Sequence, residues 1–379
     1  MAVIAFDFLS GRMVTRVAAA SWSWTRELSA EGSFECTVSD VAEAARQNLV
    51  ENAREWRTVL VDADWVDGPT GRVLDVHASG IVHSRKFEDS KATFTCAGFA
   101  SILSRLLVVN HELANRKISG QILDHESEDI VVPPDWQMSH GGALADIMVK
   151  MLMEAGSYVD LPVTLPDYEG GTNNRVYYST DLATVLDRFN DLSNVENGPE
   201  YQFTPHIIDG LLSHSLDLGH PELRPEVHRI DATLDGVPVT DVTMDASGAD
   251  MATDVWASGG KQDDKILVSR ATSASLTDRG WPRLMVADTS HQSVSEIDTL
   301  AAHARVTLQR GSEPSEVFSF KVGRDYATIS PGDWVDLRWQ SWFMPTPKWW
   351  ALKVLQVSGD EGEWLSVSCR ERVENYGSL

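Results

Sequence analysis

Alternating apolar and polar residues dominate the first hundred residues of this chain. Every second side chain of Ser33–Val38 is apolar, and Lys91–Cys96 repeats the pattern. A period of two with aromatic and β-branched residues is typical of half-buried β-strands. Gly68–Gly71 supplies turn residues between two further runs of this kind. The pattern predicts a small antiparallel barrel or sandwich over residues 1–108, with a short helix inserted near residues 41–52.

A helical period replaces this alternation between residues 109 and 200. One predicted helix ends at Gly156, and its apolar face consists of residues spaced three or four apart: Leu144, Ile147, Met148, Met151 and Leu152. A second helix follows a loop rich in Pro, Gly and Asn, with Thr180 as its predicted N-cap. Its apolar positions are Leu182, Val185, Leu186 and Phe189. We therefore expect a helical insertion domain over residues 109–200.

The strand pattern returns at Tyr201 and continues to the last residues. Asp209 and Gly210 form a predicted hairpin turn between two strands. Pro221 and Pro225 then mark a boundary. The region 201–379 is interpreted as a second β domain, and residues 201–236 fit equally well as a return to the first one.

One helix and one turn stand out within this second β region. Ser293 and Glu296 form a capping box that begins a helix extending to Gln309. The apolar face of that helix is predicted to consist of Ile297, Leu300, Ala301, Ala304 and Leu308. Pro331 and Gly332 suit the central positions of a type II turn. The strand after that turn places Val335, Leu337 and Trp339 on one side, and the last predicted strand does the same with Leu365, Val367 and Cys369.

Composition places the chain among folded, acidic proteins. The chain is 42% apolar, which is ample for a buried core, and its 379 residues suggest two or three domains. The formal charge of −24 repels nucleic acid and anionic lipid, so it argues against a DNA-binding protein. It does not argue against a protein past which DNA slides without binding. No apolar run is long enough for a membrane helix, and Met1–Phe6 does not read as a secretion signal.

Candidate chemistry is sparse in this sequence. Cys36, Cys96 and Cys369 are interpreted as buried, reduced thiols, with a metal ligand or a nucleophile as the alternatives. His125–Asp129 is the densest group of potential ligands, and it is interpreted as a solvated acidic turn, with a metal site as the alternative. His140 is expected at a helix start, and His303 on an exposed or interface surface. Motifs of serine hydrolases, zinc peptidases and nucleotide-binding loops are missing. We predict no catalytic residues, no cofactor and no metal.

Aromatic residues gather near the end of the chain, in a protein with 13 tryptophans. Aromatic clusters form protein interfaces and also bind sugars. We interpret this group as an interface with other protein chains: Trp334, Trp339, Trp342, Phe343, Trp349 and Trp350. Trp22 and Trp24 are expected to share one face of an early strand.

The order of these segments resembles the hub-type minor tail proteins of long-tailed phages, particularly phages of actinobacteria. The wider family includes the hubs of contractile tails and the base of type VI secretion spikes. Three groups of segments carry the resemblance: Gly32–Val38, Gly80–His83 and Phe94–Gly98 first, Asp187–Ser193 and Gly198–Tyr201 next, and helix 293–309 followed by Ser330–Leu337 last.

The resemblance implies a mainly β fold with an α insertion (α+β), in which two tube-like antiparallel β-barrels flank a helical insertion domain. It implies a homotrimeric ring at the distal end of the tail tube, with pseudo-sixfold symmetry and a DNA exit channel. The implied partners are the distal tail protein, the tape measure protein and tail-tip or fibre proteins. DNA would pass without specific binding, with no membrane insertion, and the protein would reside in the virion after assembly in the host cytoplasm.

Two other functions fit the sequence. One is a receptor- or carbohydrate-binding tail module, which a solvent-facing aromatic platform would favour. The other is a tail-tip wall hydrolase, which would need paired carboxylates at a separation that a sequence does not reveal.

Overall fold

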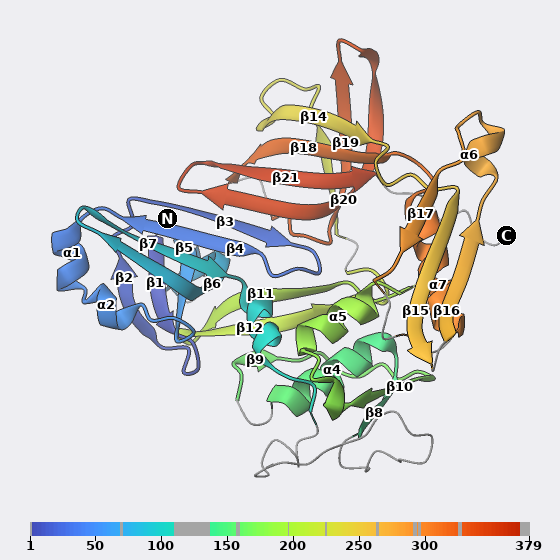
Figure 1. Ribbon diagram of the computed structural model, residues 1–379. Helices are drawn as coiled ribbons and strands as arrows, with labels where there is room; N and C mark the ends of the chain where they lie inside the picture. Colours follow the sequence, from blue (N-terminus) through green and yellow to red (C-terminus); the bar gives the residue numbers. More distant parts are fainter. Residues whose placement is uncertain are drawn as a thin grey trace.

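The computed structural model describes residues 2–68, 71–109, 137–156, 160–195, 197–223, 226–262, 265–290, 294, 297–324 and 328–371. Figure 1 shows a β-rich molecule in which the N-terminal strands, the C-terminal strands and two smaller α/β regions lie side by side. Among the described residues, no helix is both long and apolar enough to cross a membrane.

The N-terminal strands follow the alternation in the sequence. They are β1 (Ala2–Asp7), β2 (Met13–Val17), β3 (Ser21–Glu27), β4 (Ser33–Val38), β5 (Thr58–Gly68), β6 (Gly71–Glu88) and β7 (Lys91–Ala97). Phe34, Cys36 and Val38 are buried on one face of β4, as the period of two predicts. The helix expected near residues 41–52 is present as two short ones, α1 (Val41–Arg46) and α2 (Leu49–Asn52).

The C-terminal strands form a second group of similar character. They are β13 (Val227–Asp231), β14 (Val239–Ser247), β18 (Ser315–Gly323), β19 (Trp334–Ser341), β20 (Met344–Asp360) and β21 (Trp364–Glu371). The type II turn before β19 is confirmed, because Gly332 has φ +94° and the Asp333 N–H donates to the Ser330 carbonyl at 3.1 Å.

Both groups belong to one sheet, because β20 pairs with β3 antiparallel. The strand order is β14-β18-β21-β20-β3-β4-β7-β6-β5-β1-β2, with β19 on β20 and β13 on β19. Apolar residues of both groups, such as Phe34 and Phe318, share one core cluster. The mainly β, α+β fold class is confirmed, and within the described residues the strand path does not close into a barrel.

The insertion follows β7 and lies below the sheet in Figure 1. It contains η1 (Phe99–Arg105), β8 (Gln137–Gly142), α4 (Leu144–Gly156), β9 (Val163–Thr164), β10 (Asn173–Tyr178), η3 (Ser179–Asp181) and α5 (Val185–Ser193). The predicted face of α4 is confirmed, since Ile147, Met148, Met151 and Leu152 are buried there. These residues share a core with α5.

The N-cap of the second helix was predicted wrongly. Helix α5 begins after Thr184, whose Oγ1 accepts from the Asp187 N–H at 3.1 Å, while Asp187 Oδ2 accepts from the Thr184 N–H at 3.0 Å. This capping box needs an acidic residue three positions after the cap. Thr180 is followed by Ala183 at that position and lies in η3, and Leu182 is exposed with φ +49°.

A hairpin returns from the insertion to the N-terminal strands. It consists of β11 (Tyr201–Ile208) and β12 (Leu211–Leu218), joined at Asp209 and Gly210, which both have positive φ as predicted. Leu212 packs in one cluster with Ile4 and Phe6 of β1. This packing favours assigning the hairpin to the first β domain.

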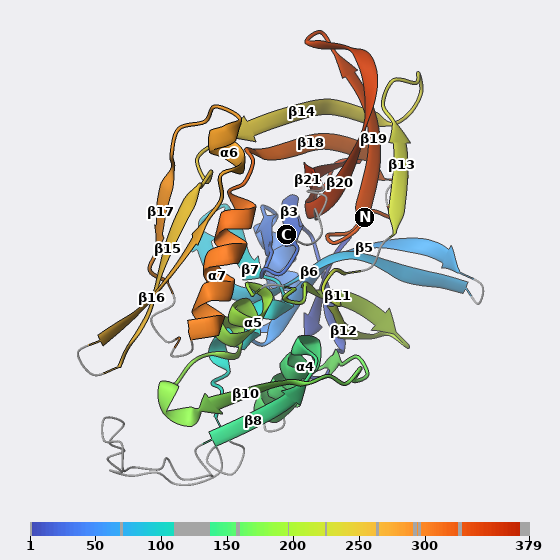
Figure 2. The same cartoon turned by 90° about the vertical axis from the view of Figure 1, so that its right-hand side faces the viewer.

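A small α/β unit lies between β14 and β18 in the sequence. It contains β15 (Asp254–Gln262), β16 (Lys265–Thr272), α6 (Ser275–Asp278), β17 (Met285–Asp288) and α7 (Ile297–Arg310). Figure 2 shows α7 lying against this three-stranded sheet. Leu300 and Ala304 are buried as predicted, whereas Ile297, the first residue of the helix, is 47% exposed. The predicted Ser293–Glu296 capping box lies outside the described residues.

Candidate functional site

The aromatic residues near the C-terminus lie on the β19–β20 hairpin, which projects at the top of Figure 1. Ser341 pairs with Met344, so Trp342 and Phe343 form the tip. Trp342 is 92% exposed and Phe343 is 48% exposed. The Phe343 ring lies edge-on to both Trp339 and Trp342, with 5.6 Å between centroids in each pair. These edge-to-face contacts order the tip and leave the Trp342 indole in solvent.

The other tryptophans of this group divide between the core and the surface. Trp334, Trp339 and Trp350 are buried, and Trp350 packs on Phe318 with 4.8 Å between ring centroids. These three are core residues of the chain itself. The predicted interface therefore narrows to Trp342, Phe343 and Trp349, and it stays a prediction.

Among the exposed residues of this aromatic group, Trp349 has two cationic neighbours. Its ring is 39% exposed, and the guanidinium carbons of Arg229 and Arg338 lie 4.4 Å and 5.9 Å from its centroid. Arg338 also pairs with Asp231 at 2.9 Å. Such cation–π contacts hold the flank of the hairpin in a fixed conformation.

A buried polar cluster joins the two groups of strands. Asp62 of β5 accepts a hydrogen bond from Trp24 Nε1 at 2.7 Å and lies 3.4 Å from Arg324, which follows β18. Asp62 is fully buried, and burial raises its pKa, against the opposing effects of Trp24 and Arg324. Arg324 also donates to the Asp360 carbonyl at 2.6 Å. This cluster is structural, because it links β3 and β5 with the ends of β18 and β20.

A second cluster surrounds the Ser330–Asp333 turn. Arg26 of β3 donates to the Ile329 carbonyl at 3.3 Å, and burial lowers its pKa to about 10. Asp333 Oδ2 accepts from the Ser330 N–H at 2.8 Å and lies 2.9 Å from His228 Nε2. Glu226, His228 and Asp333 present ligand atoms within 4.8 Å of one another. This group could not be found from the sequence, because Asp333 lies about a hundred residues from Glu226 and His228.

The geometry of this group suits a hydrogen-bonded cluster better than a metal site. The His228 imidazole and the Asp333 carboxylate already satisfy each other, and Asp333 is also held in the turn. The half-buried Arg26 places a positive charge near Asp333, which disfavours a bound cation.

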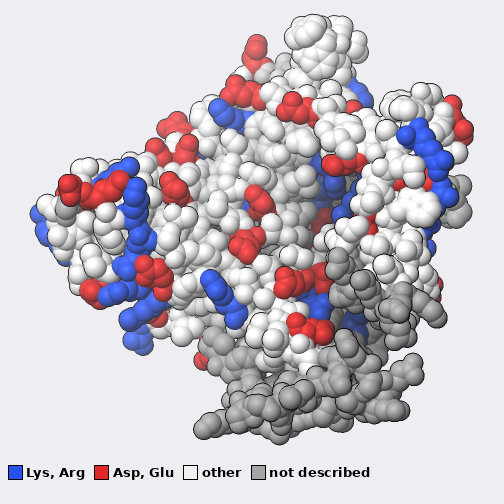
Figure 3. All heavy atoms as spheres, in the orientation of Figure 1, with Lys and Arg blue, Asp and Glu red and all other residues white. Residues whose placement is uncertain are grey.

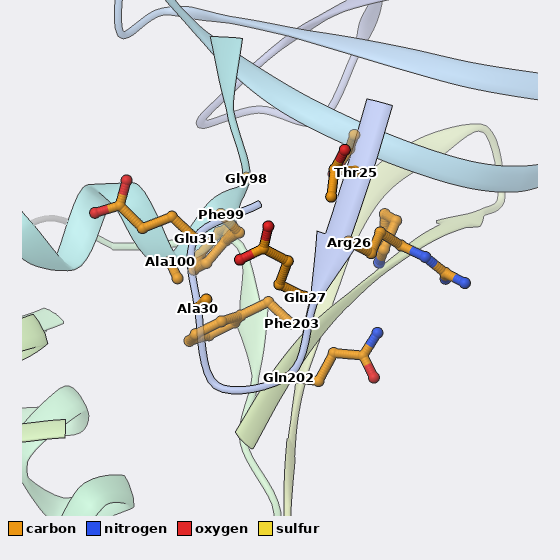
Figure 4. Close-up of a pocket in the computed structure, with 12 residues that line it drawn as sticks. Thr25, Arg26, Glu27, Ala30, Glu31, Gly98, Phe99, Ala100, Gln202 and Phe203 are labelled. Atoms are coloured by element: carbon orange, nitrogen blue, oxygen red, sulfur yellow. The ribbon is translucent and has the colours of Figure 1, made fainter. Parts of the chain in front are cut away.

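The hollow in Figure 4 lies where the end of β3, η1 and β11 meet. Its lining includes Glu27, Phe99 and Phe203, and its volume is about 30 Å³. That volume corresponds to roughly one water molecule. The hollow is therefore too small for a substrate, although Glu27 and Glu31 line it.

The candidate histidines and cysteines are mostly packed inside the fold. His140 lies in β8 rather than at a helix start, because it pairs with Arg175 of β10. His303 is buried on α7 within one turn of Leu300 and Ala304, so it lies on neither the exposed nor the interface surface that was expected. All three cysteines are buried and free, and burial raises the pKa of the Cys36 thiol to about 12. His125–Asp129 lies outside the described residues.

Three solved structures are similar to this chain over nearly its whole length. No protein-family model matches the sequence, and no curated protein is significantly similar to it. A 43 kDa tail protein of prophage MuSo2 from Shewanella oneidensis matches with a TM-score of 0.54 and 14% identity, over 98% of both chains. A tail protein from Neisseria meningitidis MC58 matches with a TM-score of 0.53 and 12% identity, over 98% of this chain and 97% of that one.

A prophage tail protein from Listeria monocytogenes EGD-e matches in the same way, with a TM-score of 0.52, 9% identity and coverage of 99% and 96%. The chain has the fold of phage tail proteins. The likeness extends over the whole chain, so the insertion and the small α/β unit belong to the shared fold as well as the two groups of strands.

Proposed function

We propose that this protein is a structural baseplate hub, or minor tail protein, of a long-tailed phage, and not an enzyme. The observation that carries the proposal is the likeness over almost the full length of three proteins named as tail proteins. The proposal places the protein in the virion at the tail tip, after assembly in the host cytoplasm.

The hub is proposed to be a homotrimeric ring. The proposal counts two β units in each chain, one made by the N-terminal strands and one by the C-terminal strands, with the insertion of residues 109–200 between them, so that three chains would supply six units for a sixfold tail tube. Within the described residues, β2 and β14 end the main strand path without a further neighbour. Free edge strands of this kind are suited to pairing with another chain.

The ring would hold the distal tail protein, the tape measure protein and tail-tip or fibre proteins, and DNA would leave through it. The acidity of the chain supports passage without binding, because each Lys or Arg on a phosphate would create a point of attachment. Figure 3 shows acidic and basic side chains interspersed on one face of a single chain. The charge that matters in a channel is the one on the surface that faces its axis.

The mass of the purified full-length protein tests the ring. Native mass spectrometry over a range of concentrations should give three times the 41.9 kDa of one chain. A six-chain ring would contradict the two-unit argument, and a monomer at every concentration would contradict the ring itself.

A receptor- or carbohydrate-binding module is the second candidate function. The 92% exposure of Trp342 at the end of a projecting hairpin favours it. Retention of the protein on host cell-wall polysaccharide, lost on Trp342→Ser and kept on Trp281→Ser, would support this function. Equal behaviour of the protein and both variants would count against it.

A further inference from the structure

The end of the β19–β20 hairpin is a convex apolar tip. Residues 339–347 carry no charge, and Trp342 is the most exposed large apolar residue among those described, with the half-exposed Phe343 beside it. The tip forms the uncharged projection at the top of Figure 3. Sites for sugars and other small ligands are mostly concave. A convex tip instead enters the surface of a larger partner.

The backbone and side chains of this tip are suited to leaving water. Pro345 and Pro347 have no N–H, so neither presents a donor that would lose its hydrogen bond to water. The Phe343 ring lies edge-on to Trp339 and Trp342 and orders the tip. Little side-chain entropy is therefore lost when the tip is buried.

Charged residues begin at a defined distance behind the tip. Lys348 lies opposite Trp339, which is three residues from Trp342, and Arg338 is four residues from Trp342. At about 3.3 Å per residue, these cations lie roughly 10–13 Å behind the tip. Interfacial anchors bury their apolar side chains about 5–10 Å into the boundary between lipid headgroups and acyl chains. A tip at that depth leaves the cations at the level of the lipid phosphates.

Charged side chains of both signs flank the tip on β13, β19 and β20. They are Arg229, Asp231, Asp336, Arg338 and Lys348. Arg229 and Lys348 are exposed and form no ion pair with a described residue; they lie over the rings of Trp349 and Trp350, 4.4 Å and 3.4 Å from the ring centroids. A mixed flank with two such cations suits a zwitterionic headgroup, because its phosphate accepts hydrogen bonds from cations. The net charge of −24 disfavours an anionic bilayer.

We propose that the tip of the β19–β20 hairpin docks on the surface of a zwitterionic phospholipid bilayer. Trp342 and Phe343 lie at the boundary between headgroups and acyl chains, where aromatic side chains are enriched in membrane-bound proteins. Arg229 and Lys348 contact the phosphates. The side chains stay within the interface of one leaflet, so no part of the chain spans the membrane. The contact goes beyond the proposed hub function, because one chain carries all of its residues.

The proposed ring would strengthen such a contact. Rotational symmetry places equivalent tips in one plane perpendicular to the ring axis, so a flat surface normal to that axis meets all three at the same height. Linked contacts raise the overall affinity without any new interaction. A single tip would bind weakly, and three tips together would bind more tightly.

Flotation with lipid vesicles tests the tip. The full-length protein should float with vesicles of phosphatidylcholine and phosphatidylethanolamine, which are both zwitterionic. Trp342→Ser should weaken this binding by about tenfold or more, as expected for the loss of one large buried apolar side chain, and Trp342→Phe should keep most of it. Trp281→Ser is the matched control, because Trp281 is 40% exposed on the small α/β unit. No flotation, or equal flotation of Trp342→Ser, would overturn the inference.

The charge of the vesicles tests the headgroup contact. Adding phosphatidylglycerol should weaken binding, most strongly at low salt, because a negative bilayer repels a chain of net charge −24. Arg229→Gln combined with Lys348→Gln should weaken binding to the zwitterionic vesicles severalfold. Tighter binding to the anionic vesicles, or unchanged binding of the double variant, would overturn the assigned contact with zwitterionic headgroups.

A fluorescent label locates the contact. An environment-sensitive dye on Thr346→Cys should shift to shorter wavelength when the zwitterionic vesicles are added, and the same dye on Asp167→Cys should not. Thr346 and Asp167 are both exposed, and Thr346 lies close to the tip. The native cysteines do not take up the dye, because all three are buried. A shift at Asp167 with none at Thr346 would place the contact elsewhere and overturn the inference.

The hub and the docking tip fail differently in these experiments. A three-chain mass without vesicle binding would overturn the docking tip and leave the hub intact. A monomer that binds vesicles through Trp342 would support the docking tip and overturn the ring. Without vesicle binding, loss of polysaccharide retention on Trp342→Ser would assign the tip to a sugar, and loss of self-association would assign it to a protein chain. Either of these results would overturn docking on lipid.

Discussion

The carboxylate of Asp62 and the guanidinium of Arg324 lie 3.4 Å apart, although 262 residues separate them in the sequence. Both side chains are buried, and Trp24 donates a hydrogen bond to the same carboxylate oxygen. The pair therefore belongs to the same junction as the β3–β20 pairing, where the N-terminal and C-terminal strands become one sheet. Breaking this ion pair should therefore weaken the junction between the two groups of strands.

Removing the cation of this pair should destabilise the protein. Arg324→Met leaves the Asp62 carboxylate buried with Trp24 as its remaining partner, and breaking a buried ion pair in this way costs about 3–5 kcal/mol. Urea unfolding should show the loss as a lower midpoint with an unchanged slope. Adding Asp62→Asn to Arg324→Met should recover part of the loss, because the double variant carries no buried charge. A double variant no more stable than the single one would show that the charge is not the cause.

The buried His214 should make the fold sensitive to acid. Burial lowers its pKa from 6.5 to about 3, with Ser79 Oγ at 2.9 Å from its Nε2 atom. The unfolded chain binds a proton below pH 6.5 and the folded chain does not until about pH 3, so stability is lost as pH falls through this window. The loss reaches about 4 kcal/mol at its lower end, at 1.36 kcal/mol per pH unit.

A comparison of variants isolates this histidine from the carboxyl groups that also titrate. The unfolding free energy of the protein should fall relative to His214→Asn as pH drops from 6.5 towards 3. His220→Asn is the control, because His220 is an exposed histidine. Parallel pH curves for the protein and His214→Asn would rule out this role for His214.

Metal should not contribute to folding at the Glu226–His228–Asp333 group. His228 and Asp333 are hydrogen-bonded to each other, and the positive charge of the nearby Arg26 disfavours a metal cation at this position. Neither a chelator nor added Zn²⁺ should move the thermal midpoint of the protein by more than about 1 °C. A ligand at a hundred times its Kd adds about 2.7 kcal/mol, which would shift the midpoint by several degrees. A rise with Zn²⁺ that His228→Ala abolishes would establish a metal site here.

Local elements of the fold could be predicted because they depend on residues a few positions apart. The alternation in β4, the buried face of α4 and the Pro331–Gly332 turn are of this kind. The missed N-cap was also a local signal, since Thr184 and Asp187 form the capping box that Thr180 lacks. The period of two also separates Trp349 from Trp350, because adjacent residues of a strand face opposite sides.

Long-range contacts could not be predicted in this way. Nothing near Asp62 in the sequence indicates Arg324, and nothing near Arg26 indicates the turn that it contacts. The exposure of Trp342 depends on the register of β19 against β20, which fixes where the hairpin turns. The sequence could locate the aromatic cluster, but only the strand pairing shows which of its rings face solvent.

The acidity of the chain predicts that the protein does not bind duplex DNA. Duplex DNA binds proteins without sequence preference mainly through Lys and Arg at its phosphates, and a chain of net charge −24 offers few such contacts. The protein should not retard duplex DNA in a gel at about 150 mM salt, where the Debye length is about 8 Å and only nearby charges act. Binding tighter than about 10⁻⁵ M would show a basic surface concentrated on the assembled ring. If the protein lines an exit channel, carboxylates should also outnumber Lys and Arg on the surface facing the axis of the trimer, and a neutral or basic lumen would leave solubility as the only role of the acidity.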